Sequence, residues 1–506
     1  LETAVAAGRL RFDPIRANRG EFFSFFLLSL IGVMLAANAN DLIWLFLALE
    51  LTSLPTYIMV AISRPTRRAQ EAAVKYFFLG AMASAMFLYG FALLYGSTGT
   101  LILTEMRDAF ARQAAGGGIG TVGIVGMILT ILGIAYKITA APMHFYAADV
   151  YEGAAAPVTA FLGFVPKTAG MIALILLIST MGWTGSMLEP GLPRPILTTL
   201  WMLAVLTMTL GNVGAILQKS VKRVLAYSSI AHSGYMLIGL IAGPGDGLNA
   251  ILFYLLAYGI MNTAAFAVLA GLERQGQEIE SMDDLAGLRV RHPMMAAVLA
   301  IASGSLLGVP PLLGFWGKLY LFIAGVEAGQ IALVVIAGLN SAISAWYYLR
   351  LIALPIMGKP SPQAETIVPG PSAWPRIAGV VTAALVLVLP VFIAGLFRAS
   401  EAATHQATQT AKSNQDPQAD AQASQIRDRK AEISNLGLGF LSAASTPSGR
   451  AHPTLLNHKP ARRRHGHQQR NQVLVCRQIV ADGGFPLGHV HQQCDAAQHH
   501  HCAAAN

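Results

Sequence analysis

The chain has 506 residues, of which 54% are hydrophobic and only 12% are charged. An ordinary soluble domain carries about 25% charged residues, so this composition excludes a typical soluble protein. The apolar residues come in blocks of about 20, the length that spans the hydrocarbon core of a bilayer. We therefore expect a chain that resides in the lipid bilayer and has no nucleic-acid partner, despite its net charge of +9.

Eleven membrane spans are expected, all of them helical, because unpaired backbone groups are too costly in lipid and no alternating barrel pattern is present. The predicted fold class is all-α, a polytopic transmembrane helix bundle. The ninth span is long enough to form two half-helices. The predicted spans are 21–37, 42–62, 72–95, 121–141, 157–180, 198–217, 226–243, 249–270, 293–327, 331–357 and 377–397.

The two ends of the chain differ from this membrane domain, which we place at residues 21–397. Residues 1–20 show no secretory signal and no initiator Met, so we expect a cytoplasmic segment that is N-terminally incomplete. Residues 398–506 are polar and without apolar periodicity, which predicts a disordered tail. The tail holds every cysteine and a cluster of histidines, but their spacing matches no zinc pattern, so we expect no metal site there; these residues are Cys476, Cys494, Cys502, His499, His500 and His501.

The distribution of lysine and arginine between the loops predicts the orientation. If the segment before the first span is cytoplasmic, the cytoplasmic loops contain fifteen of these residues. The opposite loops contain three, namely Arg107, Arg112 and Arg194. The C-terminus is then outside. Among the cytoplasmic basic residues, Lys219, Lys222 and Arg223 are interpreted as topological anchors.

Five ionisable residues fall within the apolar spans, where each charge costs a few kcal/mol and marks a functional hypothesis. They are Glu50, Lys75, Lys137, Lys167 and Lys318. Lys75 has an alternative interpretation, since it lies about one turn into its span and its side chain can reach the interface. Glu50 has a short side chain near mid-membrane and needs a cationic partner or a proton. Because consecutive spans are usually neighbours, we predict that Glu50 pairs with Lys75.

Four prolines lie close to these lysines, and each removes a backbone donor and interrupts helical bonding: Pro142, Pro166, Pro310 and Pro311. Such breaks are tolerated in membranes against protein or a water-filled cavity, and they recur at ion sites of transporters. His144 and His232 are candidate proton relays, since imidazole titrates near neutrality. The alternative is that both histidines are merely structural.

Several longer motifs resemble, in order, the subunit N family of the proton-pumping NADH-quinone oxidoreductase, respiratory complex I. They include "ELTSLPTYIMVA" at 50–61, "AAVKYFFLGAMASA" at 72–85, "VPKTAG" at 165–170 and "GVPPLLGFWGKLYLF" at 308–322. The resemblance implies an antiporter-like fold with fourteen helices, two inverted repeats and a broken helix in each repeat. It favours the N type because a lysine follows the proline where the L and M types have histidines. One departure is "AADVYEGAAAP", where the family usually has "PDVYEGAPTP".

The resemblance also implies roles for the five charged residues. Glu50 would be the glutamate of the fifth helix and Lys75 its partner on the sixth. Lys137 would be the central lysine of the broken seventh helix, Lys167 the connecting lysine and Lys318 the terminal one. The expected function is proton translocation by a multi-pass subunit of the bacterial inner membrane.

Electron transfer is expected in partner subunits, because the membrane part contains no dinucleotide fingerprint, iron–sulfur spacing or haem motif. This chain is then expected to bind no cofactor, while NADH, FMN, iron–sulfur clusters and quinone belong to its partners. The expected partners are the M-type antiporter-like subunit and small membrane-arm subunits. Two alternatives remain open at this point: a stand-alone or Mrp-type cation/proton antiporter, and a non-pumping structural subunit.

Overall fold

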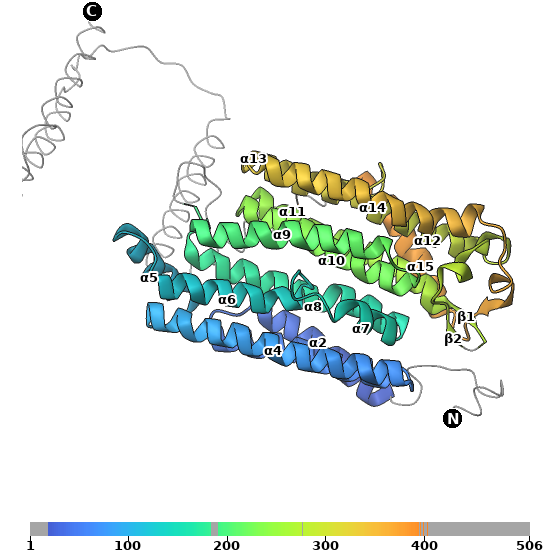
Figure 1. Cartoon of the computed structure of the whole chain (residues 1–506), viewed down its shortest axis with the longest axis horizontal. Coiled ribbons are helices and arrows are strands. Elements are labelled where there is room, and N and C mark those ends of the chain that lie inside the picture. The colour runs from blue at the N-terminus through green and yellow to red at the C-terminus, as the bar shows by residue number, and fades with distance from the viewer. Residues whose placement is uncertain are drawn as a thin grey trace, which may run out of the picture. The chain divides into compact units, whose positions relative to one another are not determined.

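The computed structural model describes residues 19–183, 191–275 and 277–393, with the isolated residues 395, 398 and 402. The interpretations of residues 1–18, of the polar tail and of its cysteines and histidines lie outside this described part. Described residues belong to one compact unit, which is helical apart from three short strands (Figure 1).

Helices follow one another along nearly the whole described chain. The first seven are α2 (Arg19–Ala37), α3 (Leu42–Ser63), α4 (Arg67–Thr98), α5 (Leu103–Ala115), α6 (Thr121–Lys137), α7 (Ala147–Gly153) and α8 (Ala156–Ile178). The others are α9 (Arg194–Ile216), α10 (Val221–Ala242), α11 (Asp246–Gly271), α12 (Pro293–Leu307), α13 (Leu313–Glu327), α14 (Ile331–Met357) and α15 (Trp374–Val388). Short 3-10 turns extend or connect some of them.

Local sequence signals set several helix ends. The Asp41 side chain accepts a hydrogen bond from the Trp44 backbone at 2.8 Å, and Thr66 caps α4 through the Ala69 backbone at 3.2 Å. At the end of α12, Gly308 adopts a left-handed conformation with φ of 95°. A Cβ at this glycine would lie 3.2 Å from Cδ of Lys318, so the small residue both ends the helix and leaves room for the lysine.

The expectation of eleven spans agrees with the described helices. Nine helices in this part of the chain are long and apolar enough to cross a membrane, and α6 and α12 are shorter apolar helices. Each short helix is continued by a partner after an interruption, giving the pairs α6–α7 and α12–α13. These two pairs are the fourth and ninth spans, so they cross the membrane in opposite directions. This is the arrangement expected of inverted repeats.

The breaks lie where three of the four prolines predicted them. Pro142 lies between α6 and α7, and Pro310 and Pro311 lie between α12 and α13. The predicted break at Pro166 is wrong, because α8 runs without interruption from Ala156 to Ile178. A proline removes only its own hydrogen-bond donor, and the surrounding turns of this long, buried helix maintain the helix direction.

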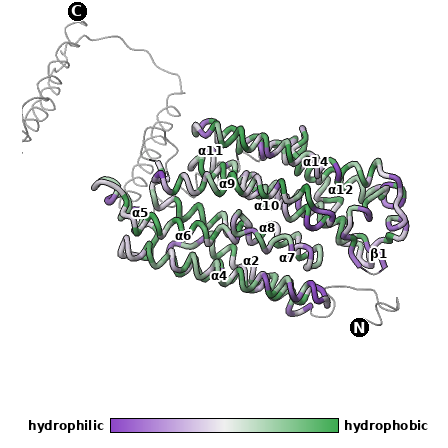
Figure 2. The backbone as a smooth tube through the Cα atoms, in the orientation of Figure 1, coloured by the Kyte–Doolittle hydropathy of each residue, from purple (hydrophilic) through white to green (hydrophobic). Residues whose placement is uncertain are grey.

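Two features were not predicted from the sequence. The small helix α5 follows α4 outside the spans. The strands β1 (Leu272–Arg274), β2 (Gln277–Glu278) and β3 (Ile367–Pro369) form an antiparallel sheet in the order β2-β1-β3. Figure 2 shows hydrophilic segments gathered around β1, at the end of the bundle to which the loop charges assign the cytoplasm. The all-α expectation therefore holds for the membrane part and misses this cap.

Candidate functional site

The Glu50 carboxylate forms an ion pair with Lys137, and the pair is largely buried inside the first half of the bundle. The Lys137 Nζ atom lies 3.1 Å from Oε1 of Glu50, and the two side chains are 2% and 18% exposed. Lys137 also donates to the Ser53 hydroxyl at 2.7 Å, and the Ser84 hydroxyl donates to Glu50 at 2.6 Å. Lys137 is the last residue of α6, where the partial negative charge of the helix C-terminus favours a cation.

The predicted pair between Glu50 and Lys75 is wrong. Lys75 instead contacts Glu71 at 2.8 Å and Asp149 at 3.1 Å, and its side chain is 45% exposed. With a rise of about 1.5 Å per residue, Lys75 lies about 12 Å from the start of α4, whereas Glu50 lies about 20 Å from the adjacent end of α3. Neighbouring helices thus place the two residues at different depths. The alternative interpretation of Lys75 as an interfacial residue fits its position.

Lys167 is buried in the bundle, and its ammonium group donates hydrogen bonds to neutral oxygens. Its Nζ atom donates to the backbone carbonyl of Ser229 at 2.6 Å and to the Ser229 hydroxyl at 2.8 Å. The ammonium also lies 4.8 Å from the centre of the Tyr258 ring, at which range a cation–π attraction operates. Ser233, one turn further along α10, donates to the Ile138 carbonyl at 2.5 Å, next to Lys137.

A chain of side-chain hydrogen bonds continues from α10 to the buried histidine. The Ser228 and Tyr348 hydroxyls are hydrogen-bonded to one another. The Tyr348 hydroxyl lies 2.8 Å from Nε2 of His232, and the Tyr254 hydroxyl lies 2.6 Å from Nδ1 of the same ring. His232 is 1% exposed. Both ring nitrogens have partners, so a proton that enters at one nitrogen can leave at the other.

Lys318 lies in the second turn of α13, just after the break in the second broken span, and its side chain reaches back to the end of α12. Its Nζ atom donates to the Leu307 carbonyl at 2.8 Å and to the Ser341 hydroxyl at 3.1 Å. The Leu307 carbonyl is one of the free acceptors at the end of α12, and the lysine satisfies it. The ammonium lies 5.0 Å from the centre of the Tyr235 ring, and that ring lies 5.9 Å from the His232 ring.

The second histidine candidate is placed differently. His144 lies in the connection between α6 and α7, is 9% exposed, and its Nδ1 atom has no hydrogen-bond partner among the described residues. Among the described residues, no hydrogen bond joins it to the lysines. Within the described chain, therefore, the structure brings Glu50, Lys137, Lys167, His232 and Lys318 into one polar row and leaves Lys75 and His144 outside it.

Sequence reasoning missed a second buried charge cluster at the end of the bundle that carries the strands. The Glu278 carboxylate contacts Arg64 and lies 2.6 Å from Nζ of Lys222, and it accepts from the Ala156 backbone at 2.9 Å. Burial acts to raise the pKa of Glu278, but Lys222 and Arg64 hold it below its usual value. Lys222 is fully buried here, so its interpretation as a topological anchor is incomplete. The sequence carried no signal of this ion pair, because Glu278 lies 56 residues after Lys222.

The basic residue beside Lys222 also has acidic partners. Arg223 lies 2.8 Å from Asp149 and 3.1 Å from Glu152, both on α7. Asp149 in turn contacts Lys75, so one carboxylate joins α7 to α4 and α10. The acids of the "DVYEG" motif thus hold the short half-helix in place. No group of residues with the composition of a metal site occurs in the described part of the chain.

Comparison with known proteins identifies the family to which this chain belongs. The family model described as "NADH:quinone oxidoreductase/Mrp antiporter, TM" matches residues 39–344. NADH-quinone oxidoreductase subunit N of Rhodospirillum rubrum is 44% identical over 341 residues, which cover 67% of this chain and 68% of that protein. The chain belongs to the NADH-quinone oxidoreductase subunit N family. Subunit N of Trichlorobacter lovleyi is 43% identical over 335 residues, covering 66% of this chain and 67% of its own length.

Solved structures share the same architecture. A chain of respiratory complex I from Thermus thermophilus is 34% identical with a TM-score of 0.64, covering 78% of this chain and 82% of its own. A chain of the Mrp complex from Dietzia sp. has a TM-score of 0.65 at 24% identity, and the match covers 75% of this chain and 76% of that chain. At this identity the likeness shows the fold alone. The subunit N relatives therefore favour the complex I assignment over the Mrp alternative.

Proposed function

We propose that this chain, as a membrane-arm subunit of NADH-quinone oxidoreductase in the bacterial inner membrane, translocates protons. The observation that carries the proposal is the buried polar row, which contains a Glu–Lys pair, two further lysines and a histidine. Serine and tyrosine hydroxyls lie between these groups and form hydrogen bonds with them. Buried ionisable groups are costly, and a row of them inside an apolar bundle has no evident purpose in packing.

Redox chemistry is assigned to partner subunits. NADH, FMN, iron–sulfur clusters and quinone would be bound there, and the described residues of this chain provide no group of metal ligands. Energy must then reach the row as a conformational or electrostatic change. The M-type subunit and the small subunits of the membrane arm are the proposed neighbours.

The Glu50–Lys137 pair is the element on which such a change would act. The nearby carboxylate stabilises the ammonium form of Lys137, and moving Glu50 away withdraws that stabilisation in a medium where a lone charge is costly. Lys137 then releases its proton toward Lys167. This mechanism assigns to Lys137 the partner role that the sequence had suggested for Lys75.

From Lys167 the proposed path continues through the hydroxyls around Ser229, Ser228 and Tyr348 to His232. The last station is Lys318, whose side chain reaches from α13 to the end of α12 and would pass the proton to the outer side. Each hydroxyl both donates and accepts, so a proton can move along the row by exchange of hydrogen bonds. Small shifts and water molecules would be needed to join neighbouring stations.

The test is replacement of Lys137 by a side chain of similar length that cannot titrate. In membrane vesicles carrying the complete complex, Lys137→Met should reduce NADH-driven proton uptake, measured with a pH-sensitive dye, by about tenfold or more. Lys359→Met is the matched control, since Lys359 is exposed in a cytoplasmic loop. Full proton uptake per NADH oxidised in assembled Lys137→Met complex would overturn the assigned role.

A further inference from the structure

Tyr151 connects the short half-helix α7 to the buried polar row. Its side chain is 2% exposed, and its hydroxyl lies 3.2 Å from the Ser229 hydroxyl. The same oxygen of Ser229 accepts a hydrogen bond from Nζ of Lys167 at 2.8 Å. The path described above runs from Lys167 through Ser229 without using Tyr151, although the Tyr151 hydroxyl is only two hydrogen bonds away from the ammonium group.

A hydroxyl beside a lysine must reverse its hydrogen bonding when the lysine loses its proton. While Lys167 is an ammonium group, it donates to Ser229, so the Ser229 proton needs an acceptor and the Tyr151 oxygen lies within reach. Once Lys167 is neutral, Ser229 can donate to its nitrogen, and Tyr151 can then donate to Ser229. Either hydroxyl of the Tyr151–Ser229 contact can be the donor, so the chain of hydrogen bonds can run in both directions.

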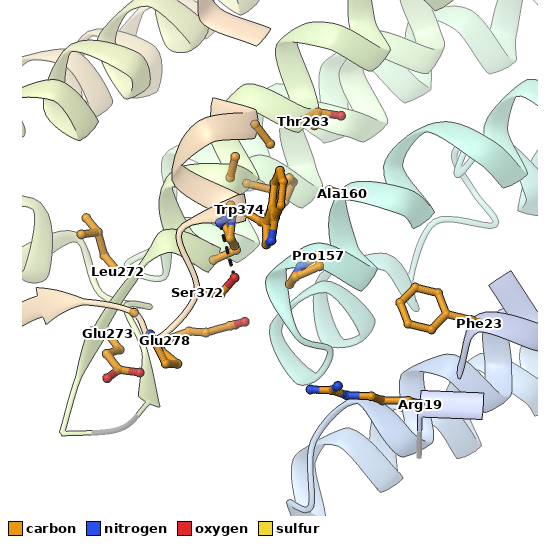
Figure 3. A pocket seen from close by; sticks show the side chains of 17 residues that line it. Arg19, Phe23, Pro157, Ala160, Thr263, Leu272, Glu273, Glu278, Ser372 and Trp374 are labelled. Atoms are coloured by element: carbon orange, nitrogen blue, oxygen red, sulfur yellow. Dashed lines mark hydrogen bonds between the residues drawn. The ribbon is translucent and has the colours of Figure 1, made fainter. Parts of the chain in front are cut away.

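The position of Tyr151 is held on both sides by contacts of α7 with charged residues. Two residues before it, Asp149 pairs with basic residues of α4 and α10. Three residues after it, the Ala154 carbonyl accepts from Lys222 at 2.9 Å, and Lys222 pairs with Glu278. Figure 3 shows Glu278 directed toward the start of α8, which follows α7 in the chain. These contacts hold the Tyr151 hydroxyl at a defined place beside Ser229.

We propose that Tyr151 is a positioning residue for proton transfer through Lys167, because it supplies the hydroxyl that lets Ser229 reverse its hydrogen bond. This inference rests on the proposed function. The ammonium form depends most on Tyr151, since without that oxygen the Ser229 proton loses an acceptor, and a buried donor without a partner is costlier than an acceptor with one partner fewer.

Other groups surround Lys167 and would remain in a variant that lacks only the Tyr151 hydroxyl. The Tyr258 hydroxyl also faces Ser229, but it donates to Asn262 at 3.4 Å. The charged residues of α2 lie in its first turn. The same station is also faced by His232 of α10 and by the ion pair of Lys137 on α6 with Glu50 on α3. A change that follows removal of the Tyr151 hydroxyl alone can therefore be assigned to this residue.

The experiment measures NADH-driven proton uptake per NADH oxidised from about pH 6 to about pH 9, in membrane vesicles carrying the complete complex. Tyr151→Phe keeps the ring and removes the hydroxyl. The loss of uptake on the alkaline side should then occur at a pH lower by roughly half a unit to one unit, a three- to tenfold change in the balance of the two forms. Tyr146→Phe is the matched control and should not shift the profile, since Tyr146 is 4% exposed and donates to the Tyr136 carbonyl at 2.8 Å.

A double variant separates this role from an effect on packing. In Ser229→Ala the Tyr151 hydroxyl has lost its partner, so adding Tyr151→Phe should shift the profile no further. Additive shifts, or an unshifted profile in assembled Tyr151→Phe complex, would overturn the role of Tyr151 while the proposed function stands if Lys137→Met still loses uptake. Full uptake in Lys137→Met would instead overturn the proposed function and this inference with it.

Discussion

Each lysine of the row is stabilised in a different way. Lys137 has a carboxylate, Lys167 has two oxygens of Ser229, and Lys318 has a helix-terminal carbonyl and a hydroxyl. An ammonium that loses its proton beside neutral acceptors remains hydrogen-bonded, whereas one beside a carboxylate leaves an unpaired anion. Lys167 and Lys318 are thus better suited to pass a proton on. In the proposed mechanism, Lys137 holds its proton until Glu50 moves away.

The tyrosine that joins Ser228 to His232 can be tested by removing one oxygen atom. Tyr348→Phe keeps the ring and its packing but removes the hydroxyl that lies 2.8 Å from Nε2 of His232. We expect proton uptake in membrane vesicles to fall severalfold, with assembly of the complex unchanged, because proton exchange between α10 and α14 is interrupted.

The neighbouring Tyr347→Phe is the control for this variant. Tyr347 is equally buried and donates to Asn212 at 2.8 Å, outside the bonds of His232. If both variants slow proton uptake to the same degree, the effect reflects packing of α14 and not a path through Tyr348.

At this scale the sequence revealed the charges more readily than their partners. Glu50, Lys137, Lys167 and Lys318 stand out because any charge is rare in an apolar span. The pairing of Glu50 depends on the relative depth of α3, α4 and α6, which hydropathy does not define. Serine and tyrosine are ordinary residues in membrane helices, so the hydroxyl links carry no signal of their own until the helices are packed.

Among the helices, α7 depends most on its neighbours. It has seven residues, fewer than an isolated helix needs to form in water. Its acids are held by basic residues of other helices, with Asp149 between Lys75 and Arg223. The half-helix is therefore positioned by charge contacts with α4 and α10.

Removing the charge of Asp149 should loosen this half-helix. In Asp149→Asn, hydrogen–deuterium exchange of residues 147–153 should increase about tenfold relative to the unmodified chain, because both ion pairs are lost. The exposed residue Asp283 offers the control Asp283→Asn, for which no change in these peptides is expected. Unchanged exchange in Asp149→Asn would mean that packing alone maintains α7.

The long elements were predictable and the short ones were not. A continuous apolar block defines a span, so α3, α11 and α14 lie close to their predicted ranges. The fourth predicted span ends at residue 141, within the break, because the polar half-helix α7 does not look like membrane sequence. The amphipathic α5 and the strands of two or three residues are too short or too polar to leave a periodic pattern.

On the scale of the whole molecule, Glu278 connects parts of the chain that are distant in sequence. It joins the end of α3 through Arg64, the start of α8 through Ala156 and the start of α10 through Lys222. Its carboxylate also lies at the N-terminus of α8, where a negative charge is favourable. Helices α3 and α8 of the first half of the bundle and α10 of the second half thus share one buried anion.

Glu278→Gln should accordingly destabilise the whole fold. Lys222 would remain fully buried without its closest anion, and breaking a buried ion pair in this way costs about 3–5 kcal/mol. Thermal melting of the detergent-extracted chain should show a clear decrease in Tm. The matched control is Glu71→Gln, which removes a pair with a 64% exposed glutamate and should change the stability by less than about 1 kcal/mol.

The effect of this substitution should also depend on pH in a defined direction. Because the ion pairs hold the pKa of Glu278 below its usual value, the folded state retains the charged carboxylate when the unfolded chain would begin to take up a proton. The stabilisation is complete above the unfolded pKa of about 4.3 and is lost as the pH falls through the lower folded value. The difference in Tm between the unmodified chain and Glu278→Gln should therefore be constant from pH 8 to pH 6 and shrink below about pH 4. A difference that instead grows on acidification would show that Glu278 is protonated in the folded chain, and the shared anion could not be what joins the two halves.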